Sequence, residues 1–111
     1  MTLTEKQLAQ NRPSGTTAVS IYTPPASTKT IITTIMICNT TALPASYSLY
    51  HDDDGTTYDA TTALAFTVSL AANSWVAVEV RICSNSATAN IAVQTSIANA
   101  LTFTFYGMEI A

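Results

Sequence analysis

The feature that most constrains the fold is a two-residue period in the apolar side chains of the second half of the chain. Leu64, Phe66, Val68 and Leu70 alternate with Ala, Thr and Ser residues, and a similar run follows at 75–82. Successive side chains of a β-strand point to opposite faces, whereas a helix repeats about every 3.6 residues. We therefore predict two half-buried strands, with the four large side chains of the first one facing the core.

Seven segments of this kind follow one another after residue 17, separated by turn residues such as Pro24-Pro25. They are predicted at 19–21, 30–39, 45–51, 63–70, 75–82, 91–97 and 101–106. Short strands at such intervals, without a helical period, indicate a sandwich or jelly-roll-like barrel. We expect a single all-β domain over residues 18–111, an antiparallel β-sandwich of about seven strands.

Residues 1–17 lack this pattern and are predicted to form an N-terminal arm. Thr4 can cap a short helix, with Leu3 and Leu8 as its hydrophobic staple. Such a helix ends before Pro13 and is marginal alone in water. The arm is therefore expected to be extended or a short helix, and to be disordered until it meets a partner.

The predicted strand 30–39 is apolar on both faces toward its end. Its even positions include Ile32 and Met36, and its odd positions are also rich in isoleucine. A strand in a two-layer sandwich normally has one solvated face. The second face is expected either to pack on another subunit or to be covered by the protein's own chain. The candidate interface residues are Leu3, Leu8, Ile32, Met36 and Trp75.

Charge is scarce in this chain, since only 10% of its residues are charged and the net charge is −3. Four Lys and Arg residues provide no basic stripe for phosphates, so nucleic acid is not an expected partner. No apolar run approaches the ~20 residues that span a bilayer, so no membrane partner is expected. The start of the chain also lacks a signal-peptide core. Cys38 and Cys83 are therefore expected to be free, buried thiols.

The ionisable residues gather in one place, from His51 to Asp59. Asp52, Asp54 and Asp59 are weak candidates for a calcium site, but the spacing of an EF-hand loop is absent. Adjacent exposed carboxylates rarely have the separated pKa values that acid–base catalysis needs. The third interpretation, a solvated Asp-rich hairpin loop followed by Gly55, is favoured by turn preferences. No metal and no cofactor is predicted.

Enzymatic signatures are also missing. The chain has a single histidine, no Gly-x-Ser-x-Gly elbow and no glycine-rich phosphate loop. We therefore predict that the protein is not an enzyme. Trp75 and the tyrosines are expected either to fill core margins and subunit contacts or to include a sugar-stacking platform.

Four stretches together resemble small β-sandwich virion proteins of tailed bacteriophages. They are Tyr22-Thr23-Pro24-Pro25-Ala26, Ile37-Cys38-Asn39-Thr40-Thr41, residues 50–58 (YHDDDGTTY) and residues 101–107 (LTFTFYG). The resemblance covers most of the chain beyond the arm, and none of these stretches is a catalytic signature.

The resemblance implies a structural component of the virion. Because the start of the chain lacks a signal-peptide core and no apolar run spans a bilayer, we expect it to be made in the host cytoplasm. Within that class a capsid decoration or cement protein is expected, a homotrimer that stabilises the head shell by binding the major capsid protein or other virion proteins. The arm would then clamp neighbouring capsid subunits. The alternative is a module of the tail, baseplate or fibre, which would bind glycans through Trp75 and exposed tyrosines.

Overall fold

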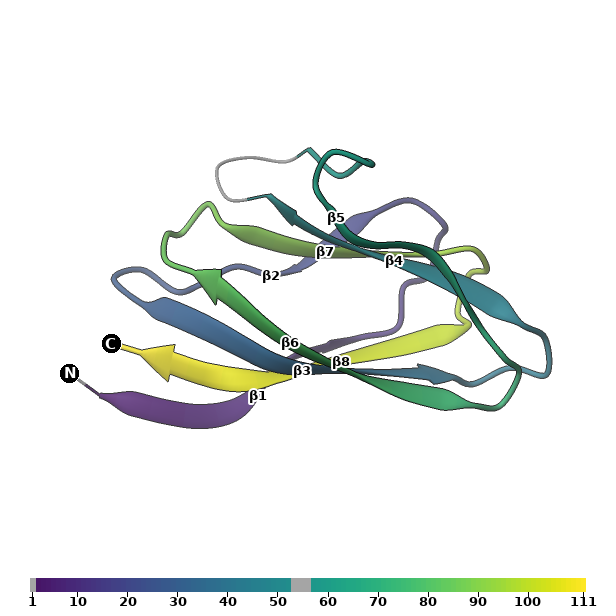
Figure 1. The fold of residues 1–111 in the computed structure, drawn as a ribbon, viewed down its shortest axis with the longest axis horizontal. Helices are drawn as coiled ribbons and strands as arrows, with labels where there is room; N and C mark the ends of the chain where they lie inside the picture. Colours follow the sequence, from purple (N-terminus) through teal and green to yellow (C-terminus); the bar gives the residue numbers. More distant parts are fainter. Residues whose placement is uncertain (1, 53–56) are drawn as a thin grey trace.

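The computed structural model describes residues 2–52 and 57–111, and these residues form two antiparallel four-stranded sheets that face each other (Figure 1). The first sheet has the order β1 (Leu3–Asn11), β8 (Leu101–Ile110), β3 (Lys29–Asn39), β6 (Trp75–Ser84). The second sheet has the order β2 (Val19–Tyr22), β7 (Asn90–Thr95), β4 (Ala45–Asp52), β5 (Ala63–Leu70). The predicted all-β sandwich is confirmed, with one strand more than expected. The described residues contain no helix of the length and apolarity needed to cross a membrane.

The core lies between the two sheets. The first sheet contributes Ile35, Ile37, Phe103 and Phe105, which have no exposed surface, and the second sheet contributes Leu49, Ile91 and Val93. Burying one such side chain stabilises the fold by about 1.5–3 kcal/mol relative to leaving it exposed. Because these residues point inward, their neighbours along each central strand point to the outer face of the sheet.

The additional strand is β1, so this segment takes the extended form, one of the two forms expected for the arm, and does not form the short helix. Residues Leu3–Asn11 pair antiparallel with β8, from Leu3 opposite Ile110 to Asn11 opposite Phe103. A helix of this length is marginal in water, whereas the edge of β8 offers backbone groups that need partners. β1 is therefore paired within its own sheet, contrary to the expectation of an arm that is disordered without a partner. The division into an arm 1–17 and a domain 18–111 stays a prediction.

The predicted orientation of β5 is also wrong. Leu64, Phe66 and Val68 are 50%, 53% and 39% exposed, and of the four expected core residues only Leu70 is buried. The pairing of β5 with β4 is irregular at two places, so the alternation in the sequence is not carried through the strand. The small side chain of Ala65, opposite Leu49, packs against the core instead.

The two cysteines are free, as predicted, but they are exposed rather than buried. Cys38 lies opposite Trp75, and Cys83 lies opposite Ile31, at the other end of the β3–β6 pair. This register keeps the two thiols apart on the outer face of the first sheet.

Candidate functional site

The outer face of the first sheet carries an exposed apolar surface where β3 and β6 run together. Trp75 is 65% exposed and lies opposite the exposed Cys38, and the next outward pair is Ala77 opposite Met36. Side chains two residues apart on one strand share a face, so these four form one continuous group. We call Trp75, Cys38, Ala77 and Met36 the Trp75 surface.

Of the predicted interface residues, the structure brings Met36 and Trp75 together on this surface. Leu3 lies on β1, at the opposite edge of the sheet, and is 56% exposed. Leu8, also on β1, is partly buried and packs against the core. The contacts that these residues make with other subunits stay a prediction.

Ile32 requires a correction, because it has no exposed surface and belongs to the core. The pairing of β3 with both β6 and β8 is irregular between Ile32 and Thr34. This irregularity changes the face that even-numbered residues occupy, so Ile32 points inward and Met36 outward. A uniform two-residue period, applied to the whole strand, could not show the change.

A second exposed apolar side chain lies on the loop that follows β3, next to the turn before Trp75. Leu43 is 63% exposed, and the two segments are joined by backbone hydrogen bonds from Asn39 to Ser74 and from Asn73 to Thr41. Asn39 is buried, and its Nδ2 donates to the carbonyl oxygens of Leu43, Leu70 and Ala71. This side chain therefore holds the loop and the turn in place around the Trp75 surface.

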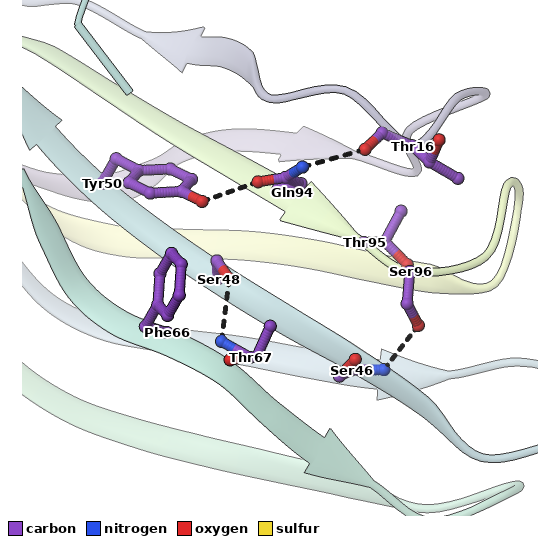
Figure 2. A pocket seen from close by; sticks show the side chains of 9 residues that line it. All are labelled: Thr16, Ser46, Ser48, Tyr50, Phe66, Thr67, Gln94, Thr95 and Ser96. Carbon is purple, nitrogen blue, oxygen red and sulfur yellow. Dashed lines mark hydrogen bonds between the residues drawn. The ribbon is translucent and has the colours of Figure 1, made fainter. Parts of the chain in front are cut away.

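The outer face of the second sheet is hollowed by a groove of about 250 Å³ (Figure 2). Its lining has no charged side chain and consists of Thr16, Ser46, Ser48, Tyr50, Phe66, Thr67, Gln94, Thr95 and Ser96. These residues come from β4, β5, β7, the residue after β7 and the segment before β2, and we call them the hydroxyl groove.

Two hydrogen bonds fix the amide of Gln94 in the groove. The hydroxyl of Tyr50 donates to Gln94 Oε1 at 2.6 Å, and Gln94 Nε2 donates to the carbonyl oxygen of Thr16 at 3.0 Å (Figure 2). Tyr50 is buried although it faces away from the core, because Phe66 and Tyr58 lie against its ring. The floor of the groove is thus held rigid by its own side chains.

Backbone strain occurs at the edge of the same groove. Thr67 has a φ of 49°, a value that is rare for a β-branched residue and costs on the order of 1–3 kcal/mol. In this conformation its N–H donates to Ser48 Oγ at 2.9 Å. The neighbouring Phe66 then stands edge-on to Tyr50, with ring centroids 6.5 Å apart and an interplanar angle of 76°.

Part of the groove could be found from the sequence, because Ser46, Ser48 and Tyr50 share one face of a predicted strand. The other lining residues could not, since Gln94 and Phe66 join this face only through the strand order β7-β4-β5. That order depends on long-range pairing.

Two of the acidic residues near His51, Asp52 and Asp59, accept local hydrogen bonds. Asp52 is buried and accepts a hydrogen bond of 2.7 Å from the N–H of Thr57. Asp59 accepts from the N–H and the hydroxyl of Thr61, and these bonds hold the pKa of its carboxyl below the usual value. Asp54 lies outside the described residues. Within residues 2–52 and 57–111, no three His, Cys, Asp or Glu side chains gather as metal ligands.

Comparisons with known proteins assign this chain to no family. No protein-family model matches the sequence, and no curated protein matches it. A solved structure described as that of the infectious bursal disease virus Gx strain is similar over 97% of this chain and 30% of its own chain. The two share 9% sequence identity with a TM-score of 0.42. This likeness is too distant to assign a function.

Proposed function

We propose that this protein is a structural component of a virus particle, a capsid decoration or cement protein that forms oligomers and stabilises the head shell. The observation that carries the proposal is the Trp75 surface, an exposed patch of apolar side chains. The chain as a whole has few charged residues. The resemblance of four sequence stretches to phage virion proteins supports the same role.

The Trp75 surface has the chemistry of a protein contact. Tryptophan is among the residues that contribute most to binding energy at interfaces, whereas charged residues are depleted at interface centres. The next outward residue of β6 is Glu79, whose carboxylate accepts a hydrogen bond of 3.5 Å from Thr34 Oγ1 and lies outside the Trp75 surface. The Trp75 surface itself contains no Asp, Glu, Lys or Arg, so its desolvation removes apolar area from water.

The arm is the second element of the proposal. In the described structure β1 pairs with β8 and makes only a small contact with β2, so it lies at an edge of the first sheet. An edge strand whose backbone pairs on one side can add a second chain on its free side. We expect β1 and the exposed Leu3 to contact neighbouring shell subunits. Repetition over many identical sites then makes weak single contacts sufficient.

The mass of the full-length protein in solution tests the self-association. We expect light scattering coupled to size exclusion to give a multiple of 11.8 kDa, with a trimer as the specific expectation. Trp75→Ala should lower this mass toward the monomer, and Leu64→Ala, on the other sheet, should leave it unchanged. A monomer at 100 μM, or a Leu64→Ala effect equal to that of Trp75→Ala, would contradict the proposal.

The place in the particle is a separate question, and electron microscopy of intact virions answers it. Density for the sandwich on the head shell would support a decoration protein. Density on the tail, baseplate or fibre would instead favour the alternative module.

A further inference from the structure

We propose that the hydroxyl groove binds one pyranose ring of a neutral glycan. This site lies on the second sheet, on the face opposite to the Trp75 surface, so it goes beyond the assembly role proposed above. The inference depends on three properties of the groove, which are the charge, the hydrogen-bonding groups and the ring of Phe66.

The charge of the lining selects the class of ligand. All nine lining residues are uncharged, and the groups they present are hydroxyls, one amide and two aromatic rings. An ionised ligand would lose water here without gaining an opposite charge, which is unfavourable. A neutral ligand with many hydroxyls meets no such cost.

The serine hydroxyls have hydrogens to donate. Ser48 Oγ accepts from the N–H of Thr67, and Ser96 Oγ accepts from the N–H of Ser46 at 2.8 Å. A hydroxyl has one donor and two acceptor sites, so each oxygen keeps its own hydrogen. Within residues 2–52 and 57–111, neither hydroxyl donates its hydrogen to a protein acceptor. Both groups lie in the groove wall, where a ligand oxygen can accept from them (Figure 2).

Gln94 adds a donor that is already oriented. One hydrogen of Nε2 is used by the Thr16 carbonyl, and Tyr50 holds Oε1, so the amide cannot rotate without losing both bonds. The second hydrogen of Nε2 remains for a ligand. Groups fixed before binding lose little conformational entropy when the ligand arrives.

Phe66 provides the apolar side of the site. Its ring is half exposed at the edge strand β5 and is supported by the ring of Tyr50. A pyranose has one face of C–H groups and a rim of hydroxyls, so it can stack on a ring while its rim reaches the serines and Gln94. A volume of about 250 Å³ is below the range usual for drug-sized ligands, which suits a single ring.

The experiment uses the full chain and an array of neutral oligosaccharides built from hexoses, N-acetylhexosamines and deoxyhexoses, with sialylated glycans beside them. The neutral glycan with the strongest signal is then titrated in ¹H–¹⁵N NMR. We expect saturable shifts of the Thr67 and Gln94 amides. Binding of no neutral glycan, or of sialylated glycans alone, would overturn the inference.

Variants separate the groove from the other surfaces. Phe66→Ala is expected to weaken binding at least tenfold, and Phe66→Tyr, which keeps a ring, to retain it. Leu64→Ala removes a similarly exposed side chain of the same strand outside the groove and should have no effect. If Trp75→Ala abolishes binding while Phe66→Ala does not, the site is the Trp75 surface and the inference fails. The oligomer mass is measured on the same samples, so loss of assembly and loss of glycan binding are distinguishable.

Discussion

The hydroxyl of Tyr22 in β2 donates a hydrogen bond of 2.8 Å to Glu109 Oε2 in β8, and so links the two sheets. The same hydroxyl lies 2.7 Å from Thr30 Oγ1, and Lys6 Nζ lies 3.1 Å from the other carboxylate oxygen of Glu109. The hydrogen bond from Tyr22 lowers the pKa of Glu109, and burial raises the pKa of Tyr22 to about 12. This cluster ties β1, β2, β3 and β8 at one end of the sandwich.

The lowered pKa of Glu109 predicts that the fold loses stability in acid. A carboxyl whose pKa is lower in the folded state stabilises the fold above its unfolded value of about 4.5, and this contribution disappears as pH falls through the folded pKa. We expect the free energy of unfolding to fall by about 1 kcal/mol on this account. Urea unfolding between pH 6 and pH 2.5 measures it. Glu109→Gln should flatten the dependence, with a remainder from Asp59, whose pKa is also lowered; an unchanged slope would exclude Glu109 as the cause.

The raised pKa of Tyr22 predicts that the fold also loses stability in alkali. Because its folded pKa is raised from 10.0 to about 12, the proton stabilises the fold fully below pH 10, and the contribution is lost as pH rises from 10 to about 12. Tyr22→Phe should cost about 1–3 kcal/mol at pH 7, because it removes the bonds to Thr30 and Glu109. The variant should also show a shallower decline above pH 10, with a remainder from Tyr47, whose pKa is raised by burial. Equal declines in both proteins would contradict this role.

At Gly107 the backbones of β3 and β8 lie too close together to leave room for a side chain. A Cβ at this position would lie 2.9 Å from the Cα of Ile32 and closer still to the carbonyl oxygen of Ile31. Both are backbone atoms of the neighbouring strand, so relief requires the strands to separate. Gly107→Ala should cost about 3 kcal/mol or more in denaturant unfolding.

Gly15 is the matched control for this substitution, because no described atom beyond Gly15 and its two chain neighbours lies within 4 Å of a Cβ built there. Gly15→Ala should change stability by less than about 0.5 kcal/mol. Similar costs at the two glycines would contradict the close approach of β3 and β8.

The sequence predicts this fold where a local rule decides the outcome and fails where pairing between distant strands decides it. The two-residue period in 75–82 finds β6, whose Val76, Val78 and Val80 pack against the core. The stronger period in 63–70 misleads, because β5 lies at a sheet edge and its irregular pairing leaves Leu64 and Phe66 outside. The pairing of the arm with the first sheet is missed for a related reason. Its partner is β8, about a hundred residues away in sequence, and the few apolar residues of 3–11 do not reveal that pairing.

Thr67 gives the last prediction, because its positive φ is a cost that glycine does not bear. Thr67→Gly should raise the free energy of unfolding by about 1 kcal/mol, the strain released exceeding the entropy that glycine loses on folding. Thr102→Gly, at a partly buried position where β8 pairs regularly with β3, should instead lower it by about 0.5–1 kcal/mol. Thermal unfolding of the two variants side by side measures the difference. If both substitutions destabilise equally, Thr67 has ordinary strand geometry, and the position of Phe66 at the groove must have another cause.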